Sequence, residues 1–77
     1  MEKLRAYLNT LSTDQQKSFA EDCGTTIGYL RKAISQNELV KPITCVRIEQ
    51  NSSGAVTRHD LHPDDWHLIW PELAVAA

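Results

Sequence analysis

The sequence predicts a small all-α domain, a compact bundle of about five helices. Its 77 residues suffice for one small domain, and the 42% apolar share suffices for a single helical core. Apolar residues recur at helical spacing in several segments, and glycines, prolines and capping residues separate these segments. We therefore expect one domain over residues 1–77, in which residues 64–77 form a C-terminal helix and tail.

The first two helices are predicted from an apolar stripe and a capping pattern. Residues 2–11 carry apolar side chains at the spacing i, i+3, i+4 and i+7 of an amphipathic helix, namely Leu4, Tyr7, Leu8 and Leu11. Ser12 and Gln15 then fit a capping box, in which the hydroxyl accepts a backbone N–H and the amide bonds back. This capping box predicts a second helix that ends near Cys23.

A glycine separates the second predicted helix from a third. Gly24 can take the left-handed backbone conformation that ends a helix, since it has no Cβ to clash. Thr25 is expected to cap the helix that follows. The apolar side of that third helix consists of Ile27, Leu30, Ala33 and Ile34.

A fourth helix and a turn are predicted next. Pro42 suits the first turn of a helix, because the N–H that it lacks would be unpaired there. The helix is mostly apolar, with Ile43, Cys45, Val46 and Ile48. Residues 51–54, NSSG, have turn composition and are expected to reverse the chain.

The remaining residues predict two shorter helical segments. Thr57 with Asp60 resembles another capping box ahead of a single turn. Asp64 and Asp65 favour the start of a last helix, because acidic side chains stabilise a helix N-terminus. Pro71 is expected to stop that helix.

Residues 16–35 have the layout of a helix-turn-helix, a motif that binds DNA. Ala20 lies where two helices would cross closely, Gly24 where the chain reverses, and Leu30 on the buried side of the second helix. In this motif the N-terminal part of the second helix faces base edges in the major groove. The layout therefore predicts that the third helix of the domain contacts double-stranded DNA.

The predicted DNA contacts lie on and around this third helix. They are Gln16, Thr25, Thr26, Ile27, Tyr29, Arg31, Lys32 and Lys41. Threonine and tyrosine hydroxyls can bond phosphate, Arg31 can bind guanine with two hydrogen bonds, and Lys32 is expected to hold phosphate. Gln16 would touch the DNA backbone from the start of the preceding helix, and Gly28 would let the protein backbone approach closely.

Several of these residues also have a structural interpretation. Thr25 is a helix cap as well as a possible phosphate contact. Ile27 can face either the core or a thymine methyl group. Tyr29 can pack against the first helix, and Arg31 and Lys32 alone would be an ordinary solvated helix face.

The charge distribution is compatible with a local DNA-binding surface. The net charge of −2 is not the strongly basic total of a nonspecific nucleic-acid binder. Residues 16–47, however, hold Lys17, Arg31, Lys32, Lys41 and Arg47 against Glu21, Asp22 and Glu38. Residues 48–77 hold Arg58 against Glu49, Asp60, Asp64, Asp65 and Glu72.

The cysteines and histidines do not form a recognisable metal or catalytic pattern. Cys23 and Cys45 are expected to be small buried thiols, not a disulfide or half of a metal site. The spacing of the three histidines does not place two of them on one helix face, and no CxxC or HExxH pattern occurs in the sequence. We expect neither a metal nor another cofactor.

Other protein classes are also disfavoured. A helical chain of this size leaves little room for a shaped catalytic pocket, so we expect no enzyme. No apolar run approaches the roughly 20 residues of a membrane span, and the N-terminus MEKLRAYLNTL does not look like a signal peptide. We therefore expect a cytoplasmic protein without a membrane partner.

Two stretches carry a resemblance to a known family. CGTTIGYLRKAIS at 23–35 resembles a helix-turn-helix corner and reading helix, and RIEQNSSGAVTRHDLHPDDW at 47–66 resembles a closing segment. On these stretches residues 16–63 resemble the Cro-like phage repressors grouped with the YdaS-type antitoxins, within the lambda-repressor-like fold. The most specific part is GAVTRHDL followed by a Pro-Asp pair.

The resemblance implies both a fold and a function. It implies a compact bundle of about five helices that binds operator DNA, usually as a dimer, and represses transcription. It further implies that Thr25, Thr26, Ile27, Tyr29, Arg31 and Lys32 contact bases and phosphates.

The sequence departs from the family pattern in three places. The connection SQNELVKP carries Glu38 beside a single Lys41, where such proteins often have basic loop residues, and His62 stands where an arginine-like residue is expected. The tail WHLIWPELAVAA is longer and more apolar than the short fold needs. We expect it to be partly buried and to form a homodimer or higher oligomer through Ile69, Trp70 and Leu73.

The sequence thus predicts a sequence-specific DNA-binding transcriptional repressor of the phage or prophage type, which acts by occupying its operator. The alternative is an antitoxin-type interaction module, whose apolar tail covers a partner toxin or regulator protein and for which DNA autoregulation is secondary.

Overall fold

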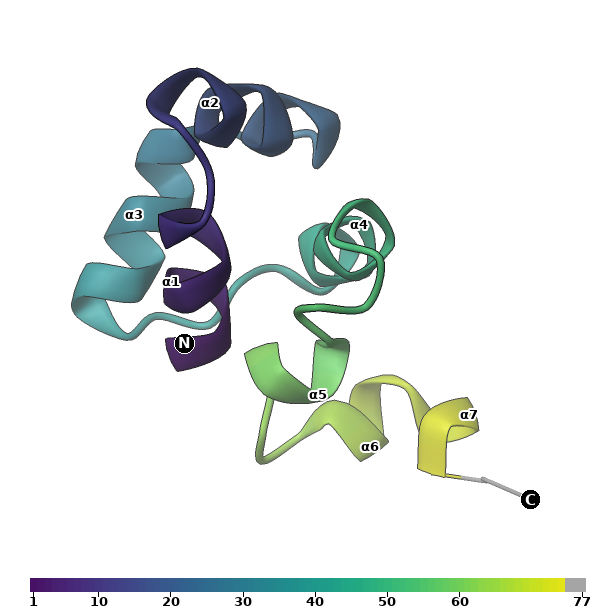
Figure 1. Cartoon of the computed structure of the whole chain (residues 1–77). Coiled ribbons are helices and arrows are strands. Elements are labelled where there is room, and N and C mark those ends of the chain that lie inside the picture. Colours follow the sequence, from purple (N-terminus) through teal and green to yellow (C-terminus); the bar gives the residue numbers. More distant parts are fainter. Residues whose placement is uncertain (75–77) are drawn as a thin grey trace.

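The computed structural model describes residues 1–74, in which helices are joined by short connections (Figure 1). The helices are α1 (Glu2–Asn9), α2 (Thr13–Asp22), α3 (Ile27–Gln36), α4 (Pro42–Asn51), α5 (Arg58–Leu61), α6 (Trp66–Ile69) and α7 (Pro71–Ala74). Residues 1–74 contain no strand, which confirms the all-α prediction. Four helices of eight to ten residues are thus followed by three of four residues each.

The connection between α1 and α2 follows from the capping box. The hydroxyl of Ser12 accepts a hydrogen bond from the backbone N–H of Gln15 at 3.2 Å, and the Gln15 side chain accepts one from the Ser12 N–H at 2.9 Å. This capping box confirms the predicted start of α2. The prediction that the first helix reaches residue 11 is wrong by two residues, because the N–H groups of Thr10 and Leu11 bond three residues back in a tight turn.

At the corner between α2 and α3, one prediction is confirmed and one is wrong. Gly24 has a φ of 75°, the left-handed conformation expected of it. The cap of α3 is Thr26 and not Thr25: the Thr26 hydroxyl accepts from the N–H of Tyr29 at 3.1 Å. Thr25 still belongs to the end of α2, since its own N–H donates to the carbonyl of Ala20 at 3.0 Å.

The later helices begin at the residues that the sequence indicates. Pro42 is the first residue of α4, where no N–H is required. Thr57 and Asp60 form the predicted capping box at α5, and Asp65 is the N-cap residue of α6. Pro71 ends the preceding pattern as expected, but it also starts the additional turn α7.

The core is shared by all the longer helices and by the segments after α4. Its buried apolar residues are Leu4, Leu8, Phe19, Ala20, Cys23, Leu30, Ala33, Val40, Cys45, Ile48, Val56, Leu61 and Trp70. Both cysteines are free and buried, as predicted. Burial raises the pKa of the Cys23 thiol to about 11 and that of Cys45 to about 12, so both thiols stay protonated at neutral pH.

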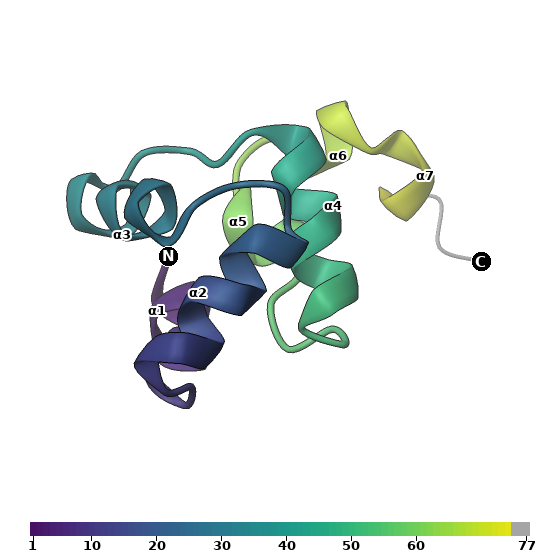
Figure 2. The ribbon, with the colours of Figure 1, turned by 90° about the horizontal axis from the view of Figure 1, so that it is seen from above.

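The packing places α3 and α7 at opposite sides of the molecule. Helix α3 packs against α1 and α2, and α2 also packs against α4. Seen from two perpendicular directions, α7 lies on the far side of the molecule from α3 (Figure 1; Figure 2). One surface of α3 is therefore left open at the end of the bundle that is remote from α7.

His62 ties the connection between α3 and α4 to the segment that follows α5. Its side chain is buried, and its Nε2 donates to the backbone carbonyl of Val40 at 2.6 Å. Its Nδ1 lies 3.0 Å from Oδ1 of Asp65. The imidazole thus holds two segments that are 22 residues apart, and it occupies a core position at which the family resemblance suggested a basic side chain.

We predict that His62→Ala lowers the free energy of unfolding by about 1–3 kcal/mol, because both ring contacts are lost inside the core. Urea denaturation followed by circular dichroism measures this change. The matched control is His67→Ala, since His67 is exposed. Equal stability of the two variants would show that the His62 contacts do not hold the fold together.

Candidate nucleic-acid interface

Helices α2 and α3 are arranged as the helix-turn-helix layout requires. Ala20 is fully buried where the two helices pack, which a larger side chain would prevent. Gly24 forms the corner, and the side chain of Arg47 from α4 lies over it. Leu30 is fully buried on the inner side of α3. The three residues that suggested the motif therefore occupy the expected structural positions.

At the N-terminus of α3, only some of the residues predicted to contact DNA are exposed to solvent. Thr26 and Gly28 are exposed, whereas Thr25 is half-buried. Ile27 is also half-buried and packs against the core cluster. Both interpretations of Ile27 thus have a physical basis: one part of its side chain is in the core, and the rest reaches the surface.

Tyr29 links α3 to the start of α4. Its hydroxyl oxygen accepts a hydrogen bond from the backbone N–H of Lys41 at 3.2 Å, and its ring packs partly against the core. The polar contact of Tyr29 is therefore with the connection between α3 and α4. Lys41 itself is exposed at the N-cap of α4, on the same connection.

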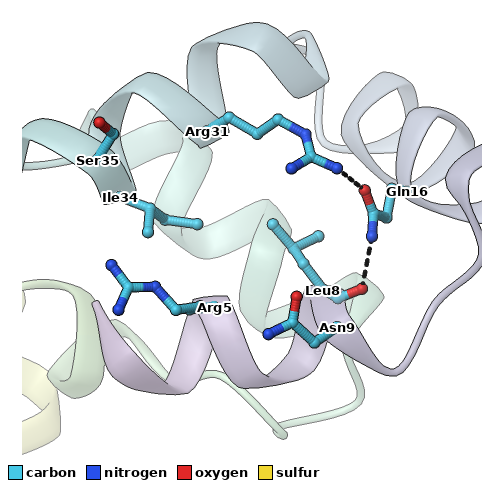
Figure 3. A pocket seen from close by; sticks show the side chains of 7 residues that line it. All are labelled: Arg5, Leu8, Asn9, Gln16, Arg31, Ile34 and Ser35. Carbon is cyan, nitrogen blue, oxygen red and sulfur yellow. Dashed lines mark hydrogen bonds between the residues drawn. The ribbon is translucent and has the colours of Figure 1, made fainter.

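Gln16 and Arg31 form the most extensive polar contact of the candidate site. The Gln16 amide nitrogen donates to the carbonyls of Leu8 at 2.9 Å and Leu11 at 3.3 Å, and its oxygen accepts from Nη2 of Arg31 (Figure 3). The Gln16 residue is only 8% exposed, although it was predicted to touch the DNA backbone. Its amide is instead engaged with the end of α1 and with α3.

A groove between α1 and α3 extends this site beyond the predicted residues. It has a volume of about 480 Å³, and the residues that line it are Arg5, Leu8, Asn9, Gln16, Arg31, Ile34 and Ser35. Sequence reasoning missed Arg5, Asn9 and Ser35. The polar face of the first amphipathic helix contains Arg5 and Asn9, but only the packing of α1 beside α3 brings them to the site.

The cationic side chains of α3 point away from the core. Arg31 and Lys32 are both exposed, and Arg31 is additionally held by Gln16. Among residues 1–74, no group of three His, Cys, Asp or Glu side chains is placed to hold a metal ion. None of the helices formed by these residues is long and apolar enough to cross a membrane.

The predicted dimerisation cluster is only partly at the surface. Trp70 is 8% exposed and belongs to the core, where the guanidinium of Arg58 lies 5.5 Å from the centre of its ring. Trp70 itself therefore offers little surface for the predicted subunit contact. Ile69 and Leu73 are half-buried and pack against the core, and residues 75–77 of the tail lie outside the described residues.

Comparison with known proteins assigns the chain to a family. The prophage transcriptional regulatory protein of Escherichia coli (strain K12) is 36% identical over 61 residues, which are 79% of this chain and 92% of that relative. The chain belongs to the family of this prophage regulator. No family model matches the sequence, and no solved structure matches it. The phage regulator family is thus shown, while the narrower Cro-like or YdaS-type resemblance stays a prediction.

We predict that Gln16→Leu lowers the free energy of unfolding of this prophage regulator homologue by about 1–3 kcal/mol, because it removes three hydrogen bonds from a buried position. The urea midpoint is the measurement. Gln50→Leu, at an exposed position of α4, is the matched control and should change stability much less. A loss no greater than that of the control would refute a structural role for Gln16.

Proposed function

We propose that this chain is a sequence-specific DNA-binding transcriptional repressor that acts by occupying an operator. The observation that carries this proposal is the arrangement of α2 and α3 around Gly24, with Leu30 buried and the opposite side of α3 exposed. A helix presented in this way fits the major groove of B-DNA. The relative's name, a prophage transcriptional regulatory protein, supports the same role.

The start of α3 offers the groups that would approach base edges and phosphates. The exposed Gly28 lets the backbone come close to DNA, and the free N–H groups of the first turn favour a phosphate. Thr26 lies at the same end, where its hydroxyl oxygen already accepts from Tyr29 but its O–H can still donate. Lys32 and Lys41 add exposed positive charge, which suits contacts with phosphate.

Such a repressor acts by binding alone and requires neither catalysis nor a cofactor. Its bound form would cover the operator and obstruct the polymerase. We further propose a homodimer, for which a two-fold axis would set the two α3 helices about 34 Å apart and require a roughly palindromic site. Ile69 and Leu73 remain the proposed contacts of that dimer, whereas the buried Trp70 supports them from within the core.

The experiment that tests this function is selection from a random duplex library with the purified protein. The selection is done at low and at near-physiological salt, because the nonspecific phosphate contribution weakens as ions are added. We expect an enriched palindrome that survives the higher salt. In the variant Arg31→Ala/Lys32→Ala, which loses two exposed cations of α3, the enrichment should be lost.

The control for this selection is Lys3→Ala, which removes an exposed cation on α1. It should enrich the same palindrome as the wild type. Failure of the folded wild-type protein to enrich any duplex would refute the proposed function. Loss of enrichment in the control as well would show that total charge, and not the surface of α3, determines binding.

A further inference from the structure

The groove between α1 and α3 brings together two arginines from different helices. Arg5 extends from α1 and Arg31 from α3, and both line the same hollow (Figure 3). Among the described residues, none of the seven that line the groove is acidic. The Arg31 guanidinium turns toward Gln16 and the Arg5 guanidinium toward the other end of the groove, so the two walls present positive charge and N–H donors along its length (Figure 3).

Both arginines keep donors available for a ligand. A guanidinium has five N–H groups, and the hydrogen bond of Arg31 to Gln16 uses a single nitrogen, Nη2. Arg5 pairs with Glu2 at 3.2 Å, but both side chains are at least half exposed. Such a surface ion pair is weak, so Arg5 can exchange it for a more favourable partner.

Gln16 determines where Arg31 can act. Its buried amide is bonded to Leu8 and Leu11 at the end of α1, and it holds the Arg31 guanidinium on the side of α3 that faces α1. In this position Arg31 lies along the flank of α3. A guanidinium fixed at the flank of a DNA-reading helix can contact the DNA backbone beside the major groove. Contacts of this kind fix the orientation and register of the protein on the duplex.

We propose that the groove between α1 and α3 lies against the phosphate backbone of the operator duplex, which Arg31 contacts from the wall formed by α3 and Arg5 from the wall formed by α1. This inference rests on the proposed function, because Arg31 belongs both to α3, the proposed DNA-contacting helix, and to the lining of the groove. It makes α1 part of the DNA interface. It also assigns Arg31 to the phosphate backbone and not to a guanine base.

The test measures duplex affinity as a function of salt for Arg5→Ala, with Lys3→Ala as the matched control. Lys3 is an exposed cation on the same helix, but it does not line the groove. For Arg5→Ala we expect a loss of affinity on the order of tenfold that is similar on the selected site and on its single-base variants, and a salt slope smaller by about 0.9. Lys3→Ala should leave affinity and slope close to the wild type.

The panel of single-base variants also tests the assignment of Arg31. Arg31→Ala should weaken binding to all duplexes of the panel by a similar factor, and a relaxed preference at one base position would overturn the backbone assignment. If Arg5→Ala and Lys3→Ala have the same duplex affinity and salt slope, the phosphate site is refuted. The proposed repressor function would still be supported by the selected operator. If the wild-type protein selects no duplex, the proposed function itself is refuted, which is a separate outcome.

A further experiment tests whether the groove binds the phosphates of a duplex or a small free anion. Thermal unfolding is followed while inorganic phosphate replaces chloride at constant ionic strength. We expect the same midpoint shift in the wild type and in Arg5→Ala. A shift in the wild type that Arg5→Ala abolishes would assign the groove to a small free anion and overturn its proposed role in duplex binding.

Discussion

The buried amide of Gln16 is the interaction on which the candidate site depends. It joins the carbonyls at the end of α1 to the start of α2 and, through Arg31, to α3. Three helices are thereby connected by one side chain that is almost excluded from solvent. Because a buried amide is costly without partners, these bonds fix one arrangement of the helices and not only their proximity.

The core contacts of α3 and of the segment after α4 also stabilise this arrangement of helices. Leu30 and Ala33 bury one side of α3, and the segment after α4 closes the core through Leu61 and Trp70. His62 secures the connection that follows α3 by its bond to the Val40 carbonyl. The described residues after α4 thus contribute mainly to the stability of the bundle, while the surface of α3 that carries Arg31 and Lys32 stays exposed.

The helices and the corner between α2 and α3 could be predicted from neighbouring residues. The groove between α1 and α3 could not, because it depends on how the helices pack. The capping boxes at Ser12 and Thr57 and the left-handed Gly24 depend on neighbouring residues only, so the sequence was sufficient for them. Thr25 and Thr26 are equivalent as caps, and only the length of the turn decides between them. The groove at Arg5 was missed because it depends on contacts between α1 and α3.

The most direct test of the account is a nuclear magnetic resonance titration of the labelled protein with the selected duplex. We expect the largest amide shift changes along α3 and at Arg5 to Asn9 of α1, which form the two sides of the groove. Helices α6 and α7, on the far side of the molecule, should change least. Binding that leaves the amides of α3 unperturbed would contradict the central claim that this helix is the DNA interface.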